Sequence, residues 1–111
     1  MQPDPTPSDS SSTMRLSVVV ITRNEERNLP RLLDSVRDVA DEIIVFDSGS
    51  TDATVALAKA AGARVVSCDW KGWSATKNEA NAEARGQWIL SLDADEALTA
   101  RSRAAILNHI D

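Results

Sequence analysis

Residues 16–25 read LSVVVITRNE, an apolar run that ends in a cluster of polar side chains. The stretch Leu16 to Ile21 predicts a strand that is buried on both faces, because continuous apolar runs rich in β-branched residues are typical of parallel sheets. The same pattern recurs twice along the chain. Glu42 to Phe46 precedes DSGSTD, and Gln87 to Leu92 precedes DADE. We therefore expect three strands that each end in polar residues.

Helical patterns separate these strands. Apolar residues at i, i+3, i+4 and i+7 of the range 29–36 match one stripe of an amphipathic helix, and Pro30 suits its first turn. Further helices are expected over residues 51–61, 74–85 and 99–110, and a short strand over residues 63–67. The expected helix boundaries are a cap at Ser50 or Thr51 and stops at Gly62 and Gly86. This alternation predicts an α/β fold with a mainly parallel, Rossmann-like sheet and helices on both faces.

The bulk properties favour one small domain. Residues 1–14 are rich in Pro and Ser and predict a disordered tail, within which Met14 is a candidate start. The net charge of −5 argues against nucleic acid as a partner, and no apolar run approaches the ~20 residues of a membrane span. The single cysteine, Cys68, fits a reducing cytoplasm. Because the chain stops at Asp111 near a helix, we expect a sheet truncated after about four strands, with an exposed edge that favours self-association.

Ligands of open parallel sheets bind at the carboxyl ends of the strands, where the three polar clusters fall. Asp93 and Asp95 are two residues apart, so both carboxylates point the same way while the chain remains extended. Paired carboxylates suit Mg²⁺ or Mn²⁺ held together with substrate phosphates. The competing interpretation is an acidic start to the next helix, where negative charge favours the helix dipole.

Other polar and aromatic residues carry two interpretations each. Asp47 and Ser48 lie where they could bind a nucleotide base or ribose through hydrogen bonds, but the segment is equally suited to a capped turn. Lys77 could reach a diphosphate or lie on a solvated helix face. Trp70 and Trp73 could stack on a sugar or base, or cover the edge of the sheet.

Four motifs in order resemble family 2 glycosyltransferases: residues 18–25, residues 44–52, Lys77-Asn78 and residues 92–96. The resemblance covers residues 14 to about 100 and is closest to the branch with bacterial lipopolysaccharide core β-glucosyltransferases. It implies a GT-A fold, a nucleotide-diphosphate sugar as donor (UDP favoured), Mg²⁺ or Mn²⁺, and inverting transfer to the hydroxyl of a glycan or lipid-linked acceptor. It also implies a cytoplasmic site of action, up to the inner face of the cytoplasmic membrane. The implied donor-binding residues are Thr22, Asn24, Glu25, Asp47, Ser48, Lys77 and Asp93, and the implied metal ligands are Asp95 and Asp93.

The chain departs from the family pattern in three places. Many relatives have a second acid where Ser48 stands, and many have Arg in place of Lys77. Family members carry the general base and the acceptor site beyond the DxD motif, and here no second acidic motif follows Glu96. Residues 15–111 are therefore expected to form only the N-terminal, donor-binding part, with no catalytic base. The alternative is a non-catalytic module that binds a nucleotide sugar or a partner protein.

Overall fold

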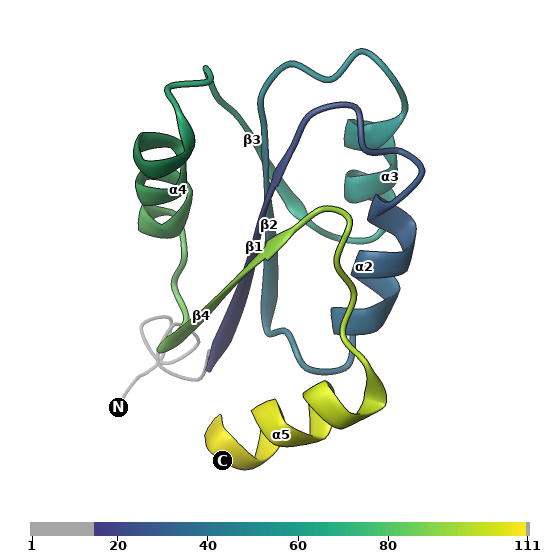
Figure 1. Ribbon diagram of the computed structural model, residues 1–111, viewed down its shortest axis with the longest axis vertical. Coiled ribbons are helices and arrows are strands. Elements are labelled where there is room, and N and C mark those ends of the chain that lie inside the picture. Colours follow the sequence, from purple (N-terminus) through teal and green to yellow (C-terminus); the bar gives the residue numbers. More distant parts are fainter. Residues whose placement is uncertain (1–14, 111) are drawn as a thin grey trace, which may run out of the picture.

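The computed structural model describes residues 15–110, which form a four-stranded parallel sheet with helices on both faces (Figure 1). The strands are β1 (Leu16–Thr22), β2 (Glu42–Asp47), β3 (Arg64–Ser67) and β4 (Trp88–Asp93). The helices are α2 (Leu29–Val36), α3 (Thr54–Ala60), α4 (Trp73–Ala82) and α5 (Ala100–Ile110). The predicted α/β fold is confirmed, whereas the predicted tail over residues 1–14 lies outside the described residues.

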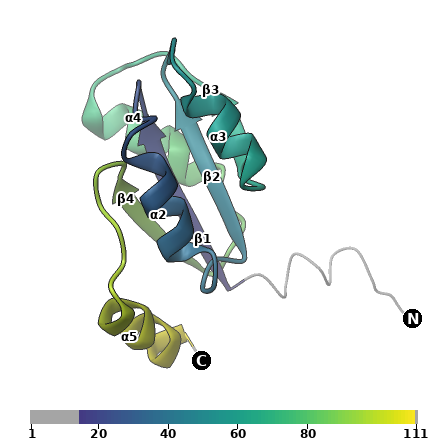
Figure 2. The ribbon, with the colours of Figure 1, turned by 90° about the vertical axis from the view of Figure 1, so that its right-hand side faces the viewer.

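The strand order is β3-β2-β1-β4, and every neighbouring pair is parallel. Strands β2 and β3 thus follow one another on one side of β1, and β4 pairs with β1 on the other side. Right-handed crossovers place helices on opposite faces when the direction of building reverses. Figure 2 accordingly shows α2 and α3 in front of the sheet and α4 behind it. The reversal creates a switch point between β1 and β4, which is where sheets of this type bind ligands.

The core lies on both faces of β1. Val18 and Val20 pack with Leu32 of α2 in the larger buried cluster, and Val19 packs with Ala80 of α4 in the smaller one. The buried pattern of β1 confirms that a continuous apolar run marks an inner strand. Ile106 and Leu107 of α5 pack against the larger cluster, as do Leu90 and Leu92 of β4.

Helix α3 starts later than its sequence pattern predicted. Ser50 and Thr51 do not cap it, because the Ser50 side chain is bonded to Asp47 and the helix begins only at Thr54. The Asp52 carboxylate instead accepts hydrogen bonds from the backbone N–H and the hydroxyl of Thr54. The polar segment after β2 is therefore a loop at the carboxyl end of the sheet, and the helix starts only after it.

The two glycines that were expected to stop helices behave differently. Gly62 has a φ of +85° and follows the end of α3, and the N–H of Ala63 closes the turn on the carbonyl of Ala58 at 3.0 Å. Gly86 does not end α4, which stops at Ala82. A Cβ at Gly86 would lie 2.8 Å from the backbone nitrogen of Ser17, so this glycine permits the close approach of a loop to β1.

Strand β4 forms one edge of the sheet. Trp88 and Ile89 at its start are 43% and 46% exposed, a large exposure for such side chains. Self-association through this edge stays a prediction. In the described part of the chain, no helix is long and apolar enough to cross a membrane.

Candidate functional site

The three polar clusters meet at one edge of the sheet. Thr22 is aligned with Asp47 across the β1–β2 pair, and Ile21 is aligned with Asp93 across the β1–β4 pair. Because neighbouring residues in a parallel sheet share a face and a level, the ends of these three strands stand side by side. The expectation that the clusters lie on a common edge is confirmed.

Asp47 is the centre of a buried hydrogen-bond network beneath this edge. Its Oδ1 accepts hydrogen bonds from the hydroxyls of Thr22 at 2.7 Å and Ser50 at 2.6 Å, and its Oδ2 accepts one from the Ser50 N–H at 2.9 Å. Burial by itself raises the pKa of Asp47, but the hydrogen bonds from Ser50, Thr22 and the backbone of Gly49 outweigh burial and lower it. Asp47 is thus a carboxylate whose oxygens are already occupied by protein donors.

Asn24 ties the loop after β1 to the loop after β2. Its φ of +55° is left-handed, a conformation that Asn tolerates better than most residues. Its N–H donates to Ser50 Oγ at 2.8 Å, and its side-chain oxygen accepts a hydrogen bond from the Thr51 N–H, also at 2.8 Å. The structure therefore shows the side chain of Asn24 bracing the loop.

A hollow of about 250 Å³ opens beside these loops. Three of its lining residues were predicted from the sequence: Thr22, Glu25 and Ser48. The other lining residues are Ile21, Arg23, Trp70 and Trp73. The wall formed by β1 and β2 thus offers hydroxyls and a carboxylate, and the wall formed by the segment after β3 offers two indoles.

A second hollow of about 230 Å³ is lined by Trp73, Ser74, Lys77 and Asp93. Trp73 lines both hollows, so they adjoin across this side chain. Lys77 of α4 and Asp93 of β4 are far apart in the sequence and come together here because α4 crosses the face of β1. The second hollow is therefore lined by the basic side chain of Lys77 and the acidic side chain of Asp93, next to the switch point.

Asp95 lies outside these two hollows. The condition under which both carboxylates would point the same way, an extended chain, is not met beyond Asp93. Strand β4 ends there and the chain turns, with the Glu96 N–H donating to the Asp93 carbonyl at 2.9 Å. The Glu96 carboxylate also accepts a hydrogen bond from the Asp93 N–H at 2.7 Å, and Arg31 of α2 donates to the Asp95 carbonyl at 3.2 Å. This turn leaves the Asp95 side chain exposed near the end of the strand.

The oxygen ligands of this edge fit a substrate-borne cation better than a protein-held one. Among the side chains that the structure describes, no three His, Cys, Asp or Glu residues are grouped closely enough to hold a metal ion. Mg²⁺ is usually held by one or two carboxylates together with substrate phosphates. Asp93 suits that mode of binding, since it is a hard oxygen ligand that lines the open second hollow, whereas Asp95 is exposed in the turn that follows it.

Sequence reasoning left the role of the tryptophans open. Their ring centroids lie 4.9 Å apart with an angle of 89° between the planes, an edge-to-face pair. The only local signal was the spacing of two indoles around Gly72 in a loop. Arg23, Ile21 and Ser74 also line the site and were not singled out, because nothing in their local sequence distinguishes them.

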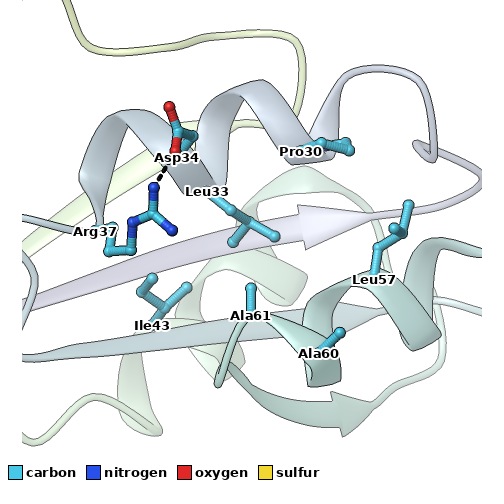
Figure 3. A pocket seen from close by; sticks show the side chains of 8 residues that line it. All are labelled: Pro30, Leu33, Asp34, Arg37, Ile43, Leu57, Ala60 and Ala61. Carbon is cyan, nitrogen blue, oxygen red and sulfur yellow. Dashed lines mark hydrogen bonds and ion pairs between the residues drawn. The ribbon is translucent and has the colours of Figure 1, made fainter.

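Another hollow, of about 290 Å³, lies between α2 and α3 (Figure 3). Figure 3 shows Leu33, Ile43 and Leu57 around it, with the Asp34–Arg37 ion pair at its rim. None of the residues predicted for the site lines it. Its apolar walls lack the convergent polar groups that a ligand site needs for orientation.

Comparison with known proteins identifies the family. The sequence model described as "Glycosyl transferase family 2" matches residues 17–111. The chain belongs to this family. An uncharacterized glycosyltransferase of Rickettsia bellii is 44% identical to the family 2 domain over 87 residues, which cover 78% of this chain and 30% of that protein. A lipopolysaccharide core biosynthesis glycosyltransferase of Rhizobium meliloti is 38% identical over 88 residues, covering 75% and 32% respectively.

Solved structures agree with this assignment. The glucosyl-3-phosphoglycerate synthase of Mycobacterium tuberculosis in complex with uridine diphosphate matches with a TM-score of 0.66 and 31% identity, over 86% of this chain and 40% of that one. The same synthase has been solved with Mn²⁺, UDP-glucose and phosphoglyceric acid, and that structure matches with a TM-score of 0.65. The family 2 domain described here spans about a quarter to a third of the length of the curated relatives it matches.

Proposed function

We propose that this chain binds the nucleotide-diphosphate sugar donor of a metal-dependent, inverting family 2 glycosyltransferase. The observation that carries the proposal is the pair of hollows joined at Trp73, which lie where the strand order reverses. They are large enough together for an extended ligand, and their polar groups differ from one end to the other. UDP is the favoured nucleotide, because the mycobacterial synthase was solved with it.

The first hollow receives the nucleoside. Thr22, Glu25 and Ser48 offer hydroxyl and carboxylate oxygens, which pair with the donor and acceptor groups on the edge of a base or with ribose hydroxyls. Asp47 lies beneath and holds the Thr22 hydroxyl in one orientation through the 2.7 Å hydrogen bond. Asp47 and Asn24 therefore support the nucleoside site by fixing the two loops that form it.

The second hollow receives the diphosphate. The chain carries a net charge of −5, so two phosphates need local positive charge, which Lys77 supplies. Asp93 and Asp95 would hold Mg²⁺ or Mn²⁺ against the phosphates. The ion would neutralise the charge that develops on the diphosphate leaving group.

We assign no general base to residues 15–110. Inverting transfer needs a base that removes the proton of the acceptor hydroxyl, and the carboxylates at this edge have other roles. Asp93 and Asp95 are assigned to the cation and Glu25 to the nucleoside, and Asp47 and Glu96 accept hydrogen bonds from the protein itself. The kinship with a lipopolysaccharide core glycosyltransferase supports a glycan or lipid-linked acceptor in the bacterial envelope. Such an acceptor would place the reaction in the cytoplasm or at the inner face of the cytoplasmic membrane.

Calorimetry with UDP, with and without Mn²⁺, tests the donor site. UDP should bind more tightly with Mn²⁺, and Asp93→Asn should remove most of this gain, about tenfold or more for a charge-assisted contact. Lys77→Ala should weaken binding under both conditions. Asp38→Asn is the matched control, because Asp38 is exposed and pairs only with Arg103 at 3.7 Å among the ion pairs seen. A folded sample that binds no UDP would refute the proposal.

A second assay tests whether the chain binds the donor without catalysing its reaction. Incubation of the chain with UDP-glucose and Mn²⁺ should release no UDP beyond the level seen with Asp93→Asn. UDP release that depends on Asp93 would show that the chain carries catalytic groups of its own, and the donor-only assignment would be withdrawn.

A further inference from the structure

We propose that Trp70 and Trp73 form an aromatic wall that holds the donor by stacking, with Trp70 against the nucleobase and Trp73 against the ribose. This inference rests on the proposed donor site and names two further residues that determine how the nucleoside is bound. It follows from the exposure of the two rings, their place between the hollows and the loop that fixes them.

Neither indole contributes to the core of the domain. Trp70 is 46% exposed and Trp73 is 61% exposed, and neither belongs to the two buried clusters. Single exposed apolar side chains are common on protein surfaces, but adjacent large ones at the wall of a hollow indicate a binding surface. The pair therefore does not serve mainly to cover the sheet.

The first hollow has two chemically different walls. Thr22, Glu25 and Ser48 bring oxygen atoms to its lining from the ends of β1 and β2, and Trp70 and Trp73 bring indoles from the segment that follows β3. A base is flat, with polar groups along its edge and a π-face on each side. Such a ring can direct its edge at Glu25 and Ser48 while one face rests on an indole, and every base offers a π-face for this contact.

The angle between the indoles separates their roles. Because the planes are at 89°, the two rings cannot both stack on the same flat ligand. Trp70 lines only the hollow that contains Thr22, Glu25 and Ser48, so it is assigned to the base. Trp73 lines both hollows, between the base side and the side with Lys77 and Asp93, which is the place of the ribose.

The loop that carries the indoles is held in place. Figure 1 shows the segment between β3 and α4 at the upper left, at the end of the sheet where the strands end. The Lys71 N–H donates to the hydroxyl of buried Thr76 at 3.1 Å, and the Thr76 N–H donates to the Gly72 carbonyl at 3.0 Å. Gly72 has a φ of +91° with nothing within 4 Å of an added Cβ, so alanine there would strain the backbone without a clash.

Tryptophan fluorescence tests the stacking directly, since the chain has three Trp and no Tyr. Trp88 lies at the start of β4, the opposite end of the sheet, so Trp88→Phe leaves only the two indoles of the wall as emitters. Titration of this variant with uridine should quench the emission, with a midpoint equal to the uridine dissociation constant from calorimetry. Glucose alone should leave the emission unchanged.

Affinities of the wall variants separate stacking from a structural role. Trp70→Leu should weaken uridine binding by about five- to a hundredfold, and Trp70→Phe should restore part of the loss, because it keeps an aromatic face. Binding of pyrophosphate with Mn²⁺ should be unchanged in both variants. Gly72→Ala should also weaken uridine binding, although it removes no contact with the ligand. Trp88→Phe, the matched control, should bind uridine as the unaltered chain does.

Two failures can be told apart. If the unaltered chain does not bind UDP, the donor site itself is refuted and the aromatic wall falls with it. If UDP and uridine bind but Trp70→Leu keeps full affinity and the emission does not change, only the aromatic wall is refuted. Quenching by glucose with none by uridine would also overturn it, because the indoles would then contact the sugar.

Discussion

Replacing Asp47 by Asn tests the hydrogen-bond network that supports the donor site. Besides the contact with the backbone of Gly49, the carboxylate accepts two hydrogen bonds from hydroxyls and one from the backbone N–H of Ser50. Asn is least disruptive if its oxygen takes the place of Oδ2 and keeps the bond from the Ser50 N–H. Its NH₂ group then faces the hydroxyls of Thr22 and Ser50, which must turn and accept instead of donate.

The expected change in the free energy of unfolding follows from the loss of the negative charge of Asp47. A hydrogen bond to an ionised group contributes ~1.5–3 kcal/mol and one between neutral groups ~0.5–1.5 kcal/mol, so three bonds lose about 3 kcal/mol together. Relief of the desolvation of a buried charge offsets part of this loss. We expect Asp47→Asn to lower the free energy of unfolding by about 2 kcal/mol near neutral pH, which is roughly 10 °C in Tm for a domain of this size.

The effect should depend on pH, with a defined sign. The pKa of Asp47 is lowered in the folded state, so the stability that the carboxylate adds is fully present above its unfolded pKa of about 3.9. This contribution declines as the pH falls through that value toward the folded pKa. The stability difference between the unaltered chain and Asp47→Asn should therefore be largest near pH ~7 and shrink below pH ~5.

Urea unfolding followed by circular dichroism measures this difference at a series of pH values. Asp38→Asn is the control, because its exposed carboxylate pairs weakly with Arg103 and its loss should cost under ~0.5 kcal/mol. The reasoning would be refuted by a cost for Asp47→Asn no larger than that of the control. A difference that stays constant down to pH ~4 would equally contradict the role given to the charge.

Three further predictions concern packing and the turn after β4. Gly86→Ala should destabilise the fold by ~1–3 kcal/mol in urea, because its Cβ would lie 2.7 Å from Ser17 Oγ, and an unchanged midpoint would contradict this. Leu32→Ala, at a fully buried position, should cost ~2–5 kcal/mol in thermal unfolding, and a cost under ~1 kcal/mol would show that the core closes around the gap. Arg31→Met removes the donor to the Asp95 carbonyl and should weaken Mn²⁺-dependent UDP binding by about three- to tenfold. Without metal, calorimetry should show the same UDP affinity for Arg31→Met as for the unaltered chain. An equal loss of affinity without metal would show that Arg31 does not act through the turn that carries Asp93 and Asp95.

Most elements of the fold could be predicted because their signals are local. The run Leu16–Thr22 and the stripe over residues 29–36 carry their own periodicity, so a strand and a helix follow from neighbouring residues alone. The errors lie at the ends of elements. Ser50 has the chemistry of a helix cap, but its hydroxyl donates to Asp47, three residues earlier in the chain. The local sequence allows both hydrogen bonds and does not show which of them forms.

The site divides in the same way. Thr22, Asp47 and Asp93 could be brought to one edge from the sequence, since parallel strands all end on the same side of the sheet. The indole wall could not, because its position depends on how the folded chain brings the segment between β3 and α4 to the end of β1. Nor could the turn at Asp95, which is held by an arginine 64 residues away in the chain.

The sequence by itself determined the α/β class, the polar strand ends and the membership of family 2, because each depends on patterns within short runs of neighbouring residues. Only the tertiary structure decided the strand order β3-β2-β1-β4 and the two adjoining hollows at the switch point. It also decided that Asp47 supports the site from beneath while the indoles face it. These features depend on contacts between distant segments, and their energies come from packing and buried hydrogen bonds that form only when the chain is folded.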